Sequence, residues 1–239
     1  MNDHIVTAFT DELESLSADL LRMGGLVEAM IMDACNATVA ADSARAMAIV
    51  DSDKEVDLLE ADIERRITEI LARRQPMARD LREVLAALKI SNELERIGDL
   101  SKSIAKRAGE MEEVRTRSVL KGLTRMGRMV ASQLANVLDA YGNRDGNLAL
   151  QVWESDEDVD HYYNSYFREV LSYMIEDPRT ISAGAHILFM AKNLERVGDH
   201  STNIAELIYF CVTGEYLNER ERPKLEQVSA ETDRRSSTA

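Results

Sequence analysis

Apolar residues recur every three or four positions along the first forty residues of the chain. The series runs Phe9, Leu13, Leu16, Leu20, Met23, Val27, Met30 and Ala34. This heptad spacing places the whole series on one helix face and is typical of a helix in a left-handed bundle. Asp42 and Ser43 interrupt the pattern, and both residue types commonly cap helix N-termini. The sequence therefore predicts one long helix that ends near residue 40 and a second that begins just after it.

Two further series of apolar residues at helical spacing predict two more helices before the pattern starts again. The inward positions of these helices are Ile49, Val56, Leu59, Ile63, Ile67 and Ile70, then Ile90, Leu94, Ile97, Ser101, Ile104 and Ala108. Pro76 separates the two stripes, and proline disfavours helical backbone in the residue before it. Because the connection is short, we expect these two helices to be antiparallel neighbours.

The same organisation then recurs in the second half of the chain. MGGLVEAM at Met23 returns as MGRMVASQ at Met126, and VDSDKEVD at Val50 returns as WESDEDVD at Trp153. Self-similarity over such a distance is the signature of a duplicated structural unit. We therefore predict an all-α fold of two tandem three-helix bundles, with six long helices and an internal pseudo-repeat.

The repeat divides the chain into three predicted regions. Residues 1–115 form the first three-helix bundle and residues 116–215 form the second. Residues 216–239 are polar and charged, and they form a predicted flexible C-terminal tail.

The charge balance excludes some classes of partner. The chain has 43 acidic and 29 basic residues, which gives a formal net charge of −14. Such a chain is repelled by nucleic acid and by anionic lipid headgroups, so we expect neither to be its ligand. Cations and basic protein surfaces are the partners that this charge favours.

The sequence also predicts a location. The first residues, MNDHIVTAFTDELESL, lack both the basic segment and the apolar segment of a signal peptide. No stretch approaches the ~20 apolar residues that span a bilayer. Cys35 and Cys211 are far apart and lack metal-binding spacing, which is typical of free thiols in a reducing compartment. We therefore predict a cytoplasmic protein.

Each half contains two pairs of acidic residues four positions apart. The pairs are Asp53 with Asp57 and Glu95 with Asp99 in the first half, then Asp156 with Asp160 and Glu195 with Asp199 in the second. Residues four apart lie on the same helix face, one turn from each other. Within each half the two pairs lie at similar distances before and after a proline, Pro76 or Pro178. On antiparallel helices they therefore come to the same level.

Four carboxylates at one level repel each other unless a cation or raised pKa values relieve the repulsion. Oxygen ligands suit hard cations, and we expect Mg, Mn or Fe ions, with several ions per site as one possibility. All eight residues are predicted metal ligands. They fall away from the apolar stripes, so we expect the sites on outward helix faces. Gly98 and Gly198 within the helices suggest close approach of another backbone.

Two segments that surround the acid pairs resemble a known family. LKISNELERIGDLSKSIA and LFMAKNLERVGDHSTNIA resemble the paired E(D)xxxD signature of the PhoU family of phosphate-uptake regulators. PMARDLREVLAALKI resembles the stretch before the first signature, whereas PRTISAGAHILFM lacks the corresponding acid and arginines. The resemblance covers residues 11 to about 214.

The resemblance implies a metal-binding cytoplasmic regulator that is often a homodimer. It implies a link between the ATPase subunit of the phosphate ABC transporter and a phosphate-responsive sensor histidine kinase. In that role the protein represses the phosphate-starvation response when phosphate is plentiful. Contact with the membrane is then only indirect, through partners.

Two other functions remain open at the level of sequence. One is a metal-dependent hydrolase or oxidase that uses the acid clusters, although no nucleophile and base combination or phosphate-binding loop is recognisable. The other is a metal-free helical scaffold whose acidic face binds a basic partner, because acids at this spacing are often only a solvated face. We predict a non-enzymatic adaptor.

Overall fold

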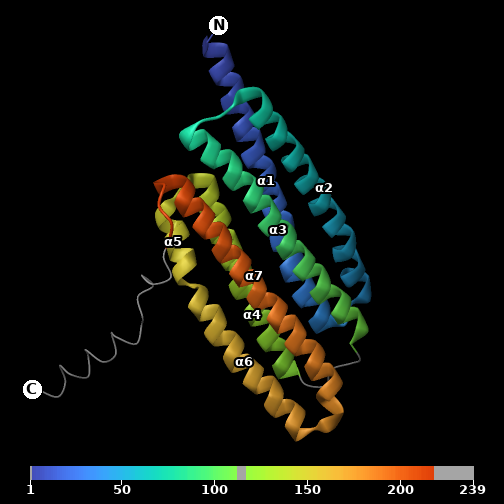
Figure 1. Cartoon of the computed structure of the whole chain (residues 1–239). Coiled ribbons are helices and arrows are strands. Elements are labelled where there is room, and N and C mark those ends of the chain that lie inside the picture. Colours follow the sequence, from blue (N-terminus) through green and yellow to red (C-terminus); the bar gives the residue numbers. More distant parts are fainter. Residues whose placement is uncertain (1, 112–116, 218–239) are drawn as a thin grey trace, which may run out of the picture.

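The computed structural model describes residues 2–111 and 117–217, and nearly all of them are helical. The helices are α1 (Asn2–Ala40), α2 (Ser43–Arg74), α3 (Ala78–Glu110), α4 (Arg117–Asn143), α5 (Gly146–Glu154), α6 (Asp156–Glu176), the short 3-10 helix η1 (Pro178–Thr180) and α7 (Ile181–Thr213). Figure 1 shows α1, α2 and α3 packed as one group beside a second group formed by α4 to α7. The predicted all-α fold with two tandem three-helix units is confirmed.

Aspartate side chains begin the second helical segment of each half. Asp42 accepts a hydrogen bond from the backbone N–H of Arg45 at 3.0 Å and caps α2. Asp145 accepts from the N–H groups of Asn147 and Leu148 at 2.9 and 3.1 Å and caps α5. These bonds satisfy N–H groups that have no partner within a first helical turn.

The second helical segment differs between the halves, because α5 and α6 are separated at Ser155 where the sequence predicts one helix. The Ser155 hydroxyl donates to the Val152 carbonyl oxygen at 2.8 Å. The Ser155 backbone N–H donates to the carbonyl oxygens of both Gln151 and Val152. Three acids follow in the first turn of α6, Asp156, Glu157 and Asp158. Acidic residues favour a helix N-terminus, so they stabilise a new helix start at this point.

The predicted stripe of α1 is confirmed as core. Leu16, Leu20, Met23, Val27, Met30 and Ala34 are each at most 3% exposed. Full burial of a leucine or methionine side chain contributes about 1.5–3 kcal/mol, so this seam is a principal source of the fold's stability. Phe9 and Leu13 pack against the same core from its edge.

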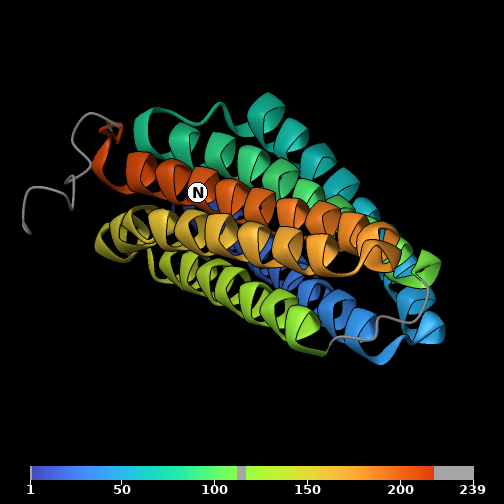
Figure 2. The ribbon, with the colours of Figure 1, turned by 90° about the horizontal axis from the view of Figure 1, so that it is seen from below.

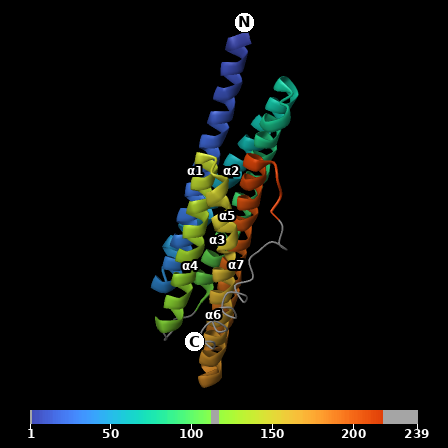
Figure 3. The ribbon, with the colours of Figure 1, turned by 90° about the vertical axis from the view of Figure 1, so that its left-hand side faces the viewer.

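The two halves share one continuous core. α1 packs along α4, and α3 packs along α7, as the elongated bundle in Figures 2 and 3 shows. Glu93 on α3 also bonds across this boundary, to His200 Nδ1 at 2.6 Å and to Asn203 Nδ2 at 3.1 Å on α7. The predicted division at residue 115 lies outside the described residues, as does the predicted tail beyond Leu217, so both stay predictions.

The outermost helices are α2, which packs on α1 and α3, and α6, which packs mainly on α7 and α4. Each outer helix therefore presents one edge to the helix that carries its half's LER(I/V)GD motif, α3 or α7. Within the described ranges, no helix combines the length and the hydropathy needed to cross a membrane.

Candidate metal centre

Four acidic side chains from α2 and α3 meet at one level of the first half. We call Asp53, Asp57, Glu95 and Asp99 the first acid group. Lys102 on α3 joins its two helices, because its Nζ lies 2.5 Å from both Asp53 Oδ2 and Asp99 Oδ1. Partial burial raises the pKa of Asp57, and the charges of Asp53 and Asp99 raise it further. The structure therefore brings these pairs to the common level that the sequence predicts.

Lys102 acts as an internal cation for the first acid group. Partial burial alone would lower its pKa, but its hydrogen bonds to Asp53 and Asp99 raise it. The hydrogen bond from Lys102 is also the main reason that the pKa of Asp99 is lowered. Glu95 lacks this partner: partial burial, Asp99 and the nearby Glu60 raise its pKa to about 7. Lys102 thus pairs with Asp53 and Asp99, whereas Glu95 pairs with Arg96, whose Nε lies 3.6 Å from Glu95 Oε2.

Two of the eight predicted ligands are buried, and the expectation that all of them face outward is wrong for these two. Asp53 is 4% exposed and Asp156 is 8% exposed. A Cβ atom at Gly98 would lie 3.8 Å from Asp53 Oδ1 and 3.4 Å from Val56 Cγ1. The nearest atoms to such a Cβ belong to side chains at ordinary contact distance, so the close approach of another backbone that the sequence suggested is not seen at Gly98.

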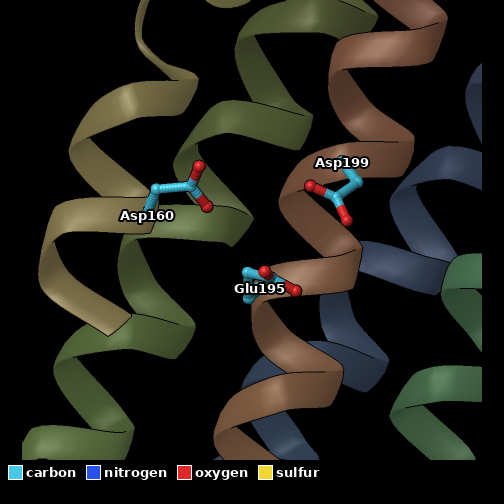
Figure 4. A group of neighbouring side chains, drawn as sticks. All are labelled: Asp160, Glu195 and Asp199. Atoms are coloured by element: carbon cyan, nitrogen blue, oxygen red, sulfur yellow. The ribbon is translucent and has the colours of Figure 1, made fainter. Parts of the chain in front are cut away.

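The second acid group consists of Asp156, Asp160, Glu195 and Asp199, from α6 and α7. Carboxylate oxygens of Asp160, Glu195 and Asp199 all lie within 4.8 Å of one another. Figure 4 shows the Asp160 carboxylate directed from α6 toward the two acids of α7. This spacing allows one ion to contact three carboxylates from two helices.

The carboxylates of the second acid group lie close enough to repel one another. Partial burial and the charges of Glu195, Asp156 and Asp160 raise the pKa of Asp199 to about 6. Lys192 Nζ lies 2.5 Å from Glu195 Oε1, but the other oxygen of Glu195 is buried without a hydrogen bond within the described residues. The site therefore retains acceptors that a bound cation could use.

A single position explains why the groups differ. The motif ERIGDLSK of the first half aligns with ERVGDHST of the second, so Lys102 corresponds to Thr202. The Thr202 hydroxyl donates to the Gly198 carbonyl oxygen at 3.1 Å and brings no charge. Lys192, in turn, corresponds to Asn92. It contacts Glu195 on its own helix, and its Nζ lies 5.5 Å from the ring centroid of Tyr163 on α6.

The donor atoms of both groups limit the chemistry that they support. All eight predicted ligands are carboxylates, which suit hard cations such as Mg²⁺ and Mn²⁺ and do not suit structural zinc or copper. The residues present in the second acid group fit such an ion, because three carboxylates converge within the span of one coordination sphere. In the first acid group an incoming ion has to displace Lys102 from its position between the carboxylates.

A family model described as PhoU domain matches residues 20–108 and 123–208. The chain belongs to the PhoU family. The two matches coincide with the two three-helix units, and each contains one acid group. Family membership gives the chain a role in the regulation of phosphate transport.

Individual PhoU proteins cover nearly the whole chain. A protein from Caulobacter vibrioides, named phosphate-specific transport system accessory protein PhoU homolog, is 49% identical over 96% of this chain and 100% of its own length. A protein of the same name from Zymomonas mobilis is 46% identical over 92% of this chain and 93% of its own. The crystal structure of PhoU from Pseudomonas aeruginosa has a TM-score of 0.80 at 40% identity, covering 87% of this chain and 100% of that one.

Three residues that lie beside the acid groups are not predicted from the sequence. Lys102 follows the E(D)xxxD motif by three positions, and the i, i+3 spacing to Asp99 could have revealed it. Glu60 lies on the same α2 face as Asp57 and raises the pKa of Glu95. Gln133 comes from α4, a helix without acid pairs, and no local pattern connects it with the second acid group.

Proposed function

We propose that this chain is a non-enzymatic cytoplasmic adaptor that binds hard metal ions at its acid groups and regulates phosphate uptake. It couples the ATPase subunit of the phosphate ABC transporter to a phosphate-responsive sensor histidine kinase. When phosphate is plentiful, this coupling represses the phosphate-starvation response. The protein acts as a homodimer and reaches the membrane only through its partners.

One observation carries the metal-binding part of this proposal. The carboxylate oxygens of Asp160, Glu195 and Asp199 lie within 4.8 Å of one another. Partial burial and mutual repulsion raise the pKa of Asp199 to about 6, so the arrangement is electrostatically unfavourable as it stands. A bound Mg²⁺, Mn²⁺ or Fe ion relieves that repulsion, and it stabilises the contact between α6 and α7.

The adaptor part is supported by the names of the relatives and by the charge of the chain. The Caulobacter and Zymomonas relatives are named accessory proteins of a phosphate-specific transport system. With a net charge of −14, the chain favours basic partner surfaces. Charge steering of this kind is screened beyond about 8 Å at physiological ionic strength, so association is faster at low salt.

The test is recovery of partners from phosphate-replete cells at two salt concentrations, combined with deletion of the gene. We expect the tagged chain to retain the transporter ATPase and the kinase, more so at low salt. We expect the deletion to switch on phosphate-starvation genes in phosphate-rich medium while the transport proteins remain present. Recovery of neither partner at low salt, together with normal repression in the deletion strain, overturns the adaptor proposal.

A further inference from the structure

Gln133, on α4, has a buried oxygen that lacks a hydrogen-bond partner. The residue is only 5% exposed, and its Oε1 accepts no hydrogen bond within the described part of the chain. A buried acceptor without a partner costs about 1–3 kcal/mol, so such an atom calls for a ligand. Glu195 Oε2 in the second acid group is another buried acceptor without a hydrogen bond among the described residues.

The hydrogen bonds of Thr202 determine which way the amide points. Its hydroxyl donates to the Gly198 carbonyl oxygen at 3.1 Å, so toward Gln133 the same hydroxyl can only accept. The group at 3.5 Å from the Thr202 hydroxyl is therefore the Gln133 amide nitrogen, a donor. The amide oxygen consequently faces away from Thr202.

That oxygen faces the buried side of the second acid group. A Cβ atom at Gly198 would lie 3.3 Å from Gln133 Oε1 and 3.6 Å from Asp156 Oδ1. The amide oxygen and the carboxylate oxygen thus border the same narrow space, which exists because residue 198 has no side chain. Two acceptor oxygens beside one space are favourable when a cation lies between or next to them.

We propose that Gln133 is a ligand of the cation held by the second acid group, and that it supplies a neutral oxygen from a third helix. This inference rests on the metal-binding part of the proposed function. An amide oxygen raises the number of protein ligands without adding charge. Because Mg²⁺ retains several waters while larger hard cations accept more protein oxygens, Gln133 favours Mn²⁺ or Ca²⁺ over Mg²⁺.

The first half has no counterpart for this ligand. In the repeat of MGGLVEAM as MGRMVASQ, Gln133 aligns with Met30, which is 3% exposed and has no oxygen in its side chain. The chain itself therefore supplies the matched substitution, Gln133→Met, which keeps a long unbranched side chain at the position. Gln133→Glu is the conservative counterpart, since it retains an oxygen at the same place.

The experiment is a titration of the full-length, chelator-stripped protein with Mn²⁺, in which the free ion is followed by electron paramagnetic resonance. A lost second-shell partner typically weakens metal binding 10–100-fold, and a lost direct ligand should cost at least as much. We therefore expect Gln133→Met to weaken the tightest Mn²⁺ site at least about tenfold, and to weaken Mg²⁺ less. Gln133→Glu should bind Mn²⁺ at least as tightly as the wild type.

Thermal unfolding in EDTA separates a ligand from a structural residue. Gln133→Met removes an unsatisfied acceptor, so its midpoint in EDTA should equal or exceed that of the wild type. A lower midpoint in EDTA with weaker binding, or unchanged Mn²⁺ affinity, overturns the assignment of Gln133. If Gln133→Met does not fold, loss of Mn²⁺ binding in Gln133→Glu overturns it instead. A wild type that binds no Mn²⁺ overturns the metal part of the proposed function as well, and the adaptor part is then decided by partner recovery alone.

Discussion

The two acid groups come from the same motif, yet their lysines contact them differently. In the first, Lys102 Nζ lies 2.5 Å from both Asp53 and Asp99 and joins α2 to α3. In the second, the corresponding residue is Thr202, and three carboxylates converge within 4.8 Å. Lys192 Nζ contacts one of them, Glu195, at 2.5 Å and lies over the ring of Tyr163 on α6. From this difference we expect the second acid group to be the tighter site for the proposed metal ion, and the first to bind an ion only when Lys102 moves aside.

Two copies of a duplicated motif can keep the same fold while the repulsion among their carboxylates is relieved in different ways. Both halves need the two helices held together at this level, where carboxylates would otherwise repel. A lysine meets that need permanently, whereas a metal ion meets it only when it is bound. If the proposed metal binding holds, we therefore expect the stability of the second half to depend more on the supply of metal than that of the first half.

The largest expected effect comes from neutralising two acids of the second acid group. Glu195→Gln with Asp199→Asn should weaken the tightest Mn²⁺ site by more than about 100-fold, since two direct ligands lose their charge. In EDTA the variant should be no less stable than the wild type, because repulsion among the carboxylates is relieved. Isothermal titration calorimetry and thermal unfolding measure the two quantities.

The matched control is the same pair of changes in the first half. Glu95→Gln with Asp99→Asn should leave the tight site intact and remove only weak binding. Equal losses of Mn²⁺ affinity in the two double variants would show that the two acid groups bind the ion equally well. That result would contradict the difference expected between them.

Replacing Lys102 should make the first acid group resemble the second. Lys102→Thr leaves the buried Asp53 without its partner, and we expect the free energy of unfolding in EDTA to fall by about 2 kcal/mol. Mn²⁺ should restore most of that loss and should bind at a second tight site. Denaturant unfolding with and without Mn²⁺ provides the measurement. A variant that is destabilised but gains no Mn²⁺ site would mean that Lys102 is purely structural.

The pH dependence of the free energy of unfolding should differ between the metal-free and the metal-bound protein. Burial and neighbouring carboxylates raise the pKa of Glu95 to about 7 and that of Asp199 to about 6. Between the ordinary carboxyl pKa near 4 and these values, the folded state holds more protons than the unfolded state, so metal-free stability falls as the pH rises. Metal binding requires the deprotonated carboxylates, so saturating Mn²⁺ should oppose this fall.

Thermal unfolding from pH 4.5 to 8, with and without Mn²⁺, tests this dependence. Glu95→Gln should remove the part of the metal-free fall that lies between pH 6 and 7. A metal-free protein whose stability rises across this window would contradict the raised pKa values.

The smallest effect concerns the two glycines. Alanine is a better helix former than glycine by about 1 kcal/mol, which favours either substitution. A Cβ at Gly98 would lie 3.4 Å from Val56 Cγ1, whereas at Gly198 it would lie 3.3 Å from both Val159 Cγ1 and Gln133 Oε1. We expect Gly98→Ala to be neutral or stabilising and Gly198→Ala to weaken Mn²⁺ binding. Equal Mn²⁺ affinity in the two variants would show that Gly198 does not border the ion.

The sequence predicts the helices and the acid pairs because both depend on local spacing. The heptad series from Leu16 to Ala34 lies on one buried face, as its periodicity requires. The matched distances from the prolines likewise place Asp53 beside Asp99, because antiparallel helices rise equally per residue.

What the sequence does not predict depends on contacts between distant segments. The break between α5 and α6 at Ser155 leaves the spacing of the apolar residues unchanged, so a helical pattern does not reveal it. The burial of Asp53 depends on the packing of α2 against α3, two helices that are distant in sequence at this level. Gln133 lies near the second acid group only because α4 packs against α7.

Anomalous diffraction from crystals of the full chain, soaked at a low Mn²⁺ concentration, tests the difference between the acid groups most directly. We expect a strong anomalous peak among Asp156, Asp160, Glu195 and Asp199. We expect Lys102 to remain in place between Asp53 and Asp99. In Lys102→Thr crystals a second peak of similar height should appear in the first acid group. An equal or stronger peak in the first acid group of the wild type would contradict the claim that the second acid group is the tighter metal site.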